Sequence, residues 1–173
     1  GVSHALATCS SDRSVRLWNY RTGVFLAELR GHEAPVFCVA LVPRALPAGG
    51  APGNTTGSVA GAGNEKGRRS WKYQPSEFVV TGGEDGARIW SLPALACVQL
   101  LSIHGGPVHS LRVFRSREPA STFLATAGRD GKLFIHPVID GRATLPRPLE
   151  GHNSWVLGLC ASKCGTLVAS CGF

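Results

Sequence analysis

The chain has 173 residues, 43% of them hydrophobic, and a formal net charge of +7, so it is long enough for one globular domain with a buried core. It contains no run of about 18 apolar residues, which excludes a membrane-spanning helix, and its first residues lack the charged and apolar segments of a secretory signal. The composition therefore predicts a globular chain that does not enter a membrane.

One sequence pattern recurs along the chain: an apolar run, a turn that contains aspartate, and a second apolar run. The turn aspartates are Asp12, Asp85 and Asp130, and a further copy begins at Leu167. Each copy predicts a β-hairpin, because short apolar runs flank a residue favoured in tight turns. Asp85 and Asp130 lie about 45 residues apart, a spacing typical of propeller blades. A threonine stands four residues before each aspartate: Thr8, Thr81 and Thr126.

In chain order, the predicted strands supply about three and a half blades of four strands. Residues 43–76 separate the first two strands of the second blade, and their Gly-, Ala- and Pro-rich composition predicts a disordered insertion. Because the chain starts inside a predicted strand and contains no Met, both ends are expected to be cuts through a longer protein. The predicted strands are 5–9, 14–18 and 24–29; 36–41, 78–82, 87–90 and 97–102; 108–114, 122–127, 132–136 and 144–149; and 155–160 and 166–171.

These repeats resemble the WD40 repeat family, which implies an all-β fold over residues 1–173, a partial β-propeller of four-stranded antiparallel blades. The family's Gly-His pair is matched at Gly31-His32 and Gly151-His152. In the family, a His, a Ser or Thr, an Asp and a Trp form a hydrogen-bonded tetrad within a blade. The resemblance implies one complete tetrad: His32, Thr81, Asp85 and Trp90. It also implies three partial ones: Thr8, Asp12 and Trp18; His104, Thr126 and Asp130, with His136 in place of Trp; and His152 and Ser170.

The resemblance also implies a protein-binding face. In the family this face is formed by the residues that flank the Val after each His and by the residue before each turn Asp. Exposed aromatic residues and Arg are frequent binding anchors, although Phe37 and Trp155 could instead pack between blades. The implied binding residues are Pro35, Phe37, Pro107, His109, Trp155 and Leu157, with Ser11, Glu84 and Arg129 at the turns.

The function predicted first is a non-catalytic scaffold or adaptor in a multiprotein complex, with other proteins or peptides as partners. A first alternative is RNA or ribonucleoprotein binding through the insertion, where Trp71 and Tyr73 lie among basic residues. A second is a substrate receptor of a cullin-RING ubiquitin ligase, because residues 18–21, Trp-Asn-Tyr-Arg, resemble the W-D-x-R box of such receptors. No cofactor and no small-molecule substrate are expected.

Catalysis and metal binding have little support in the sequence. Cys160 and Cys164 lie near His152 and could be imagined as metal ligands, or as a nucleophile with its base. Their spacing is wider than zinc sites prefer, and the tetrad already accounts for His152, so neither an enzyme nor a metal site is predicted. The six cysteines include no C-x-x-C pair, which favours a reducing compartment, the cytoplasm or the nucleus.

Overall fold

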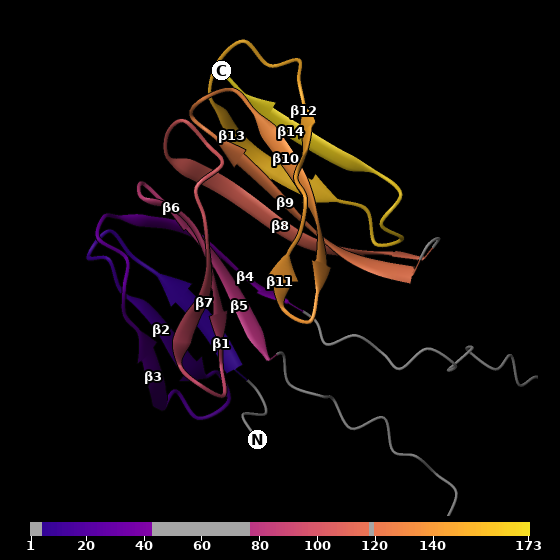
Figure 1. Cartoon of the computed structure of the whole chain (residues 1–173). Helices are drawn as coiled ribbons and strands as arrows, with labels where there is room; N and C mark the ends of the chain where they lie inside the picture. Colours follow the sequence, from indigo (N-terminus) through magenta and orange to yellow (C-terminus); the bar gives the residue numbers. More distant parts are fainter. Residues whose placement is uncertain (1–4, 43–76, 118–119) are drawn as a thin grey trace, which may run out of the picture.

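The computed structural model describes residues 5–42, 77–117 and 120–173, and every regular element in these ranges is a β-strand. The strands form antiparallel sheets that pack one against the next in chain order (Figure 1). This is the all-β architecture of successive propeller blades that the repeat predicted. Within the described ranges, no helix has the length and apolar character needed to cross a membrane.

The sheets divide the chain as the repeat spacing predicted. In strand order they are β1-β2-β3, β4-β5-β6-β7, β8-β9-β10 with β11 and β12 both paired to β10, and β13-β14. The first three strands are β1 (Ala5–Cys9), β2 (Val15–Asn19) and β3 (Phe25–Leu29). The second sheet has β4 (Val36–Val42), β5 (Phe78–Gly83), β6 (Gly86–Ser91) and β7 (Ala96–Leu101). The others are β8 (Val108–Arg117), β9 (Ala120–Gly128), β10 (Leu133–Ile139), β11 (Arg142–Ala143), β12 (Arg147–Leu149), β13 (Val156–Ala161) and β14 (Val168–Gly172).

The outer edge of the third sheet differs from the prediction of one strand at 144–149. β10 pairs there with two short segments, β11 and β12. Pro146 lies between them and has no N–H to donate to a ladder, while the Thr144 N–H donates to Pro137 O at 2.8 Å. The prediction of a continuous outer strand was therefore wrong, because a proline interrupts the pairing.

Three apolar clusters hold successive sheets together. Val15, Val79 and Trp90 belong to the cluster between the first and second sheets. Ile89 and Leu111 belong to the cluster between the second and third sheets. A smaller cluster lies between the third and fourth sheets and consists of Ala125, Ala127, Leu133, Val156 and Leu159. Burial of these faces is the main force that stacks the sheets.

The innermost strands β4, β8 and β13 share one irregularity near their first residue. In each, the pairing register shifts by one residue, between Val36 and Cys38, between Val108 and Ser110, and between Val156 and Gly158. A bulge of this kind re-aims the side chain of the extra residue. The extra residues are Phe37, His109 and Leu157, all of which were predicted to lie on the binding face.

The predicted insertion, residues 43–76, lies outside the described residues. The strands on either side of this segment are β4 and β5. Val42, the last residue of β4, pairs with Phe78, the first residue of β5. This is the opposite end of β4 from the bulge at Phe37. The expectation of disorder in this segment stays a prediction.

Candidate functional site

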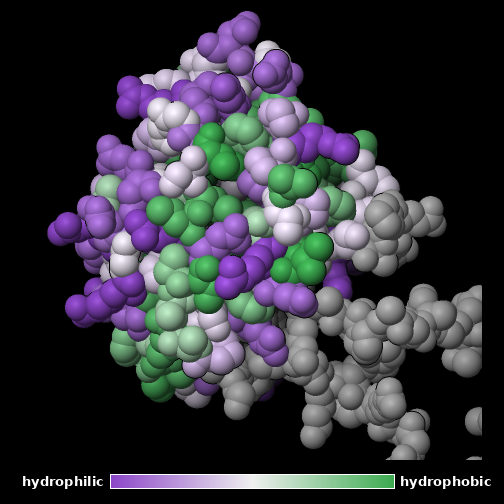
Figure 2. Space-filling view, in the orientation of Figure 1, coloured by the Kyte–Doolittle hydropathy of each residue, from purple (hydrophilic) through white to green (hydrophobic). Residues whose placement is uncertain are grey.

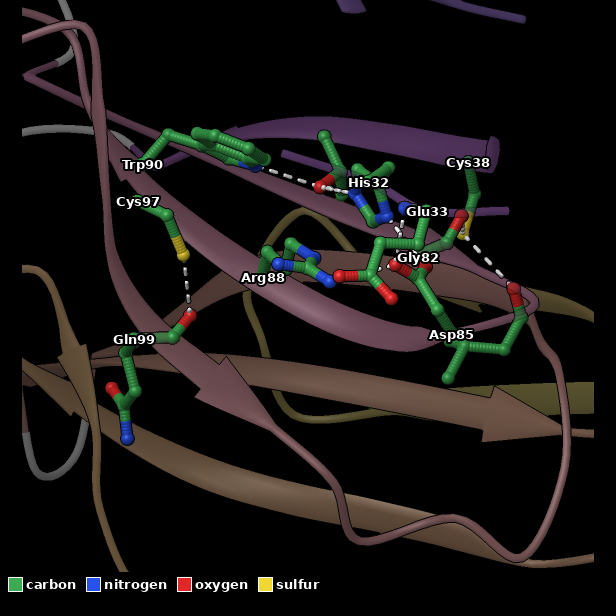
Figure 3. Close-up of polar contacts among 11 residues, drawn as sticks. His32, Glu33, Cys38, Gly82, Asp85, Arg88, Trp90, Cys97 and Gln99 are labelled. Carbon is green, nitrogen blue, oxygen red and sulfur yellow. Dashed lines mark hydrogen bonds and ion pairs between the residues drawn. The ribbon is translucent and has the colours of Figure 1, made fainter. Parts of the chain in front are cut away.

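Four side chains of the second sheet form a continuous chain of hydrogen bonds. His32, in the loop before β4, places Nδ1 2.6 Å from Asp85 Oδ1 and Nε2 2.7 Å from Thr81 Oγ1. Trp90 Nε1 donates to the same hydroxyl oxygen at 2.8 Å. Figure 3 shows His32 between Trp90 and the Asp85 carboxylate. The structure thus brings together all four residues of the tetrad that the sequence implied.

The chemistry of the donors sets the direction of each bond. A carboxylate only accepts, so His32 Nδ1–H donates to Asp85 and leaves Nε2 to accept from the Thr81 hydroxyl. Burial lowers the pKa of His32, and this chain of bonds needs the neutral ring. Burial works to raise the pKa of Asp85, but hydrogen bonds from the Glu33 N–H, His32 and Arg88 outweigh it and hold that pKa below its ordinary value. The group is therefore held as a neutral imidazole and a carboxylate.

Three of the four tetrad residues recur in the third sheet. His104 Nδ1 lies 3.0 Å from Asp130 Oδ1, and His104 Nε2 lies 3.0 Å from Thr126 Oγ1. Gly128 is required beside them, because a Cβ at this position would lie 2.7 Å from His104 Nδ1. The histidine and aspartate of this sheet are thus placed as in the second sheet.

His136 stands in β10 where Trp90 stands in β6, since each pairs with the residue two positions before the tetrad threonine. His136 is 1% exposed. Its Nδ1 lies 3.3 Å from Thr144 O, but its Nε2 has no partner among the described residues. Burial also lowers the pKa of His136. The third sheet therefore lacks the fourth bond of the tetrad and contains a buried neutral imidazole instead.

The first and fourth sheets each hold part of the pattern. Trp18 Nε1 donates to Thr8 Oγ1 at 2.8 Å. Among the described residues, the Asp12 carboxylate accepts hydrogen bonds from Ser14, within its own turn, and from no histidine. In the fourth sheet, His152 Nε2 lies 2.8 Å from Ser170 Oγ. Among the described residues, the full set of tetrad contacts is present in the second sheet, and the first and fourth sheets each contain one of its hydrogen bonds.

We expect the protein to lose stability as the pH falls below about 6.5, the ordinary pKa of histidine. The pKa values of His32 and His136 are lowered in the folded state, so below this pH the unfolded state binds more protons and the free energy of unfolding decreases. Each histidine changes the free energy of unfolding by at most about 1.4 kcal/mol per pH unit. Thermal unfolding between about pH 5 and pH 7.5 measures the slope, which should be smaller in His136→Asn. Equal slopes in the two proteins would contradict a titration of His136 on unfolding.

Aromatic rings from three successive sheets converge on one face and form what we call the aromatic ladder, Phe37, His109 and Trp155. The ring centroids of Phe37 and His109 are 5.3 Å apart, and those of His109 and Trp155 are 6.0 Å apart at an interplanar angle of 24°. Phe37 is 43% exposed and Trp155 is 36% exposed. The sequence predicted each of these residues singly, and the structure places them in contact.

Arg129 and Phe173 contact the Trp155 end of the aromatic ladder. The guanidinium carbon of Arg129 lies 4.1 Å from the Trp155 ring centroid, a cation–π arrangement. Phe173 meets the same ring edge-on at 6.0 Å between centroids. The N–H of Phe173 donates to Trp155 O as the N–H of Arg129 donates to Pro107 O. Sequence reasoning missed Phe173, although its spacing of three residues after the tetrad hydroxyl residue is the same as that of Arg129 and could have identified it.

The other predicted binding residues lie in turns or near the starts of strands. Glu84 is exposed, and its N–H donates to Pro35 O at 2.9 Å, the counterpart of the Arg129 bond. Leu157 is 41% exposed at the third bulge, and Ser11 is exposed at the first turn. In the described part of the chain, no ion pair or ring contact joins Ser11, Glu84 or Leu157 to the ladder.

A second apolar surface lies along β3. Val24, Phe25 and Leu26 are exposed there, and Figure 2 shows apolar atoms at the lower left, where Figure 1 places β3. The Trp-Asn-Tyr-Arg stretch runs from the end of β2 into the neighbouring turn. Asn19 Oδ1 accepts a hydrogen bond from the Arg21 N–H at 3.0 Å, so the asparagine stabilises this turn. The resemblance to a ligase-receptor box stays a prediction.

The alternative of a metal or nucleophile site is not assembled in the described residues. Across residues 5–42, 77–117 and 120–173, no group of three or more His, Cys, Asp or Glu side chains could hold a metal ion. Cys164 is exposed, and its hydrogen bonds with Ser162 first and Thr166 second lower its pKa to about 7. No contact in this part of the chain links Cys164 to His152 or Cys160.

Comparison with known proteins agrees with the geometry of the sheets. The family described as WD domain, G-beta repeat, matches residues 2–19 and 143–173. The first stretch includes β1 and β2, and the second extends from Ala143 in β11 to the end of β14. The matched stretches thus include the first two strands and the last strands of the described chain.

Several curated proteins are similar over longer or shorter stretches. Nuclear distribution protein PAC1 of Arthroderma benhamiae is 27% identical over 200 residues, with 89% of this chain and 41% of PAC1 covered. Telomerase protein component 1 of Mus musculus is 28% identical over 169 residues, with 94% of this chain and 5% of that protein covered. The protein SEC13 homolog of Homo sapiens is 60% identical over 37 residues, 20% of this chain and 12% of its own. The chain therefore spans less than half the length of each of these relatives.

Proposed function

The chain carries WD40 repeats, and from that premise we propose that it is a non-catalytic scaffold that binds protein segments on the face of the aromatic ladder. The complex in which it acts is a multiprotein assembly of the cytoplasm or the nucleus. The single observation that carries this proposal is the contact of Phe37, His109 and Trp155 on one face, with both end rings partly exposed.

The physical support comes from the kind of side chain and from its rigidity. Aromatic residues and Arg provide most of the energy in protein interfaces, since they bury a large area at a small cost in conformational entropy. Bulges in β4 and β8 orient Phe37 and His109, and Arg129 packs on Trp155 at 4.1 Å. These rings therefore offer a preorganised surface, which lowers the cost of binding.

The relatives support a role in assemblies in a general way. Telomerase protein component 1 is, by its name, one part of a larger assembly, and PAC1 is named for nuclear distribution. Neither name identifies a partner for this chain. The ladder supports a protein partner independently, because exposed aromatic rings grouped with an arginine fit a protein segment that buries them.

The test removes the two outer rings of the ladder together. Phe37→Ala combined with Trp155→Ala is expected to weaken partner capture by about 2 kcal/mol or more, roughly 30-fold. Both rings are partly exposed, so the variant should remain folded. Capture from cell extract, quantified by mass spectrometry for both proteins, measures the loss, and a circular-dichroism melt of each checks folding.

A matched control removes two exposed apolar residues away from the ladder, Phe25→Ala with Leu145→Ala, which are 49% and 87% exposed. This control should recover the same partners as the unchanged protein. If the ladder variant is folded and recovers them equally well, the ladder is not the binding site. Capture that is lost steeply with added salt in every protein would instead favour RNA as the partner, because phosphate contacts are electrostatic.

A further inference from the structure

The outer edge strand of the second sheet, β7, is apolar and partly exposed. In the described part of the chain it pairs only with β6, so no strand covers the main-chain groups on its other side. Ala96, Cys97 and Leu100 are exposed, and Leu100 keeps 50% of its surface accessible. Leu95, in the turn before the strand, is 47% exposed. An edge of this kind can pair with a strand of another chain.

The sequence around β7 is uncharged. Residues 89–103, which include the strand and its flanking turns, contain no Asp, Glu, Lys, Arg or His, although the whole chain has a net charge of +7. The strand itself, Ala96–Leu101, contains no proline. Charged side chains and prolines are two of the usual features that prevent edge strands from pairing with other chains. β7 lacks both of them.

The outer strands of the neighbouring sheets do have these features. β3 contains Glu28, which forms an ion pair with Arg30 at 3.1 Å. β12 contains Arg147 and Pro148 and is only three residues long. A bulge interrupts the pairing of β3 as it does that of β7, so the bulge does not distinguish these two edges. The difference lies in the charge and the proline content of the side chains.

Contacts on both sides hold β7 in place. Its sheet packs against the first sheet through one apolar cluster and against the third sheet through another. The Gln99 side chain also joins β7 to β11, because its Nε2 donates to Ala143 O at 2.8 Å and its Oε1 accepts from the Ala143 N–H at 2.9 Å. A strand that is already ordered loses little conformational entropy when it binds.

We propose that β7 is the contact between two copies of this chain, which pair antiparallel, edge to edge, about a two-fold axis. Such an axis brings each residue near it close to the same residue of the other copy. A charge near the axis would therefore face a like charge, which destabilises paired strands. The uncharged residues 89–103 avoid this repulsion, whereas Glu28 in β3 and Arg147 in β12 would not.

The partner is a second copy because β7 offers no charges that would select a different protein. Leu100 of each copy becomes buried on pairing and supplies apolar stabilisation. A strand of six residues gives a small contact, so the dissociation constant should be on the order of 10–100 µM. The aromatic ladder comes from the innermost strands, so pairing at the outermost strand gives an assembly with two accessible ladders.

Sedimentation equilibrium of the whole chain between about 1 and 200 µM measures the association. A reducing agent is present, because four of the cysteines are exposed. The unchanged protein should form dimers, and Leu100→Glu should associate at least about tenfold more weakly, since it removes an apolar side chain and places like charges across the contact. Within one copy, residue 100 lies opposite Arg88, so the glutamate should not unfold the chain, and a circular-dichroism melt checks this.

The matched control is Leu145→Glu, because Leu145 is 87% exposed and lies just before the outer strand β12 of the third sheet. This variant should associate as the unchanged protein does. An unchanged protein that stays monomeric up to about 200 µM would overturn the proposal. Association of Leu100→Glu as strong as that of the unchanged protein would also overturn it, since the two copies would then meet at another surface.

Hydrogen exchange locates the contact without any substitution and decides the matter if Leu100→Glu does not fold. Main-chain amides of residues 96–101 should exchange more slowly at about 200 µM than at about 5 µM, because pairing protects them. The amides of β3 should exchange equally at both concentrations. A rate for β7 that does not depend on concentration would contradict pairing at this edge.

Discussion

Replacing Trp90 with alanine is expected to lower the free energy of unfolding by about 3–5 kcal/mol, the usual cost of removing a large buried aromatic side chain. Trp90 has no exposed surface and packs in the cluster between the first and second sheets. Its removal opens a cavity at this junction and leaves the Thr81 hydroxyl without its indole donor. Chemical denaturation followed by circular dichroism measures the loss.

Trp18→Ala is the matched control, since Trp18 holds the equivalent position in β2 and also donates to a threonine. Trp18 is only half-buried, so its removal opens no enclosed cavity and should cost about 1–2 kcal/mol. A Trp90 variant that loses no more stability than the Trp18 variant would contradict the role assigned to the second-sheet tetrad.

Replacing Asp85 with alanine is expected to cost about 1–3 kcal/mol, because buried hydrogen-bond donors would lose their acceptor. The Asp85 carboxylate accepts from His32 Nδ1, the Glu33 N–H and Arg88. The His32 side chain is 0% exposed, so water cannot replace the lost partner at Nδ1. A melting temperature equal to that of the unchanged protein would remove the tetrad as a source of stability.

Asp12→Ala provides the comparison for this second variant. Asp12 holds the same turn position in the first sheet but is 52% exposed, and no histidine contacts it in the described part of the chain. Asp12→Ala should lower the free energy of unfolding by less than Asp85→Ala, since water can hydrogen-bond the groups that Asp12 leaves without a partner. The difference between the two variants isolates the contribution of the buried histidine contact.

Much of the chain could be predicted because its signals are local. The turn at Asp85 and the threonine four residues before it mark a hairpin in the sequence alone, and the strand limits follow within a few residues. The set of His32, Thr81, Asp85 and Trp90 followed from the resemblance, and the structure joins all four through hydrogen bonds.

Other features depended on contacts between distant residues. Pro146 could be assigned to an edge, but the division of the outer strand into β11 and β12 required knowledge of which residues pair with β10. Phe173 has the same spacing after Ser170 as Arg129 has after Thr126, but only the structure shows that its ring meets Trp155. His136 could be recognised as a substitute for tryptophan, whereas its burial and its unpartnered Nε2 are properties of the packed core.

The sequence by itself determined the hairpins, their order and the residues that each repeat contributes, because turn chemistry and alternating polarity act over a few neighbouring residues. Only the tertiary structure decided that Phe37, His109 and Trp155 meet, since their separations depend on bulges and on how three sheets pack. It alone decided that Trp90 is completely buried whereas Trp18, at the equivalent position of the first sheet, is only half-buried. Burial is set by packing between sheets, and no local pattern of residues reports it.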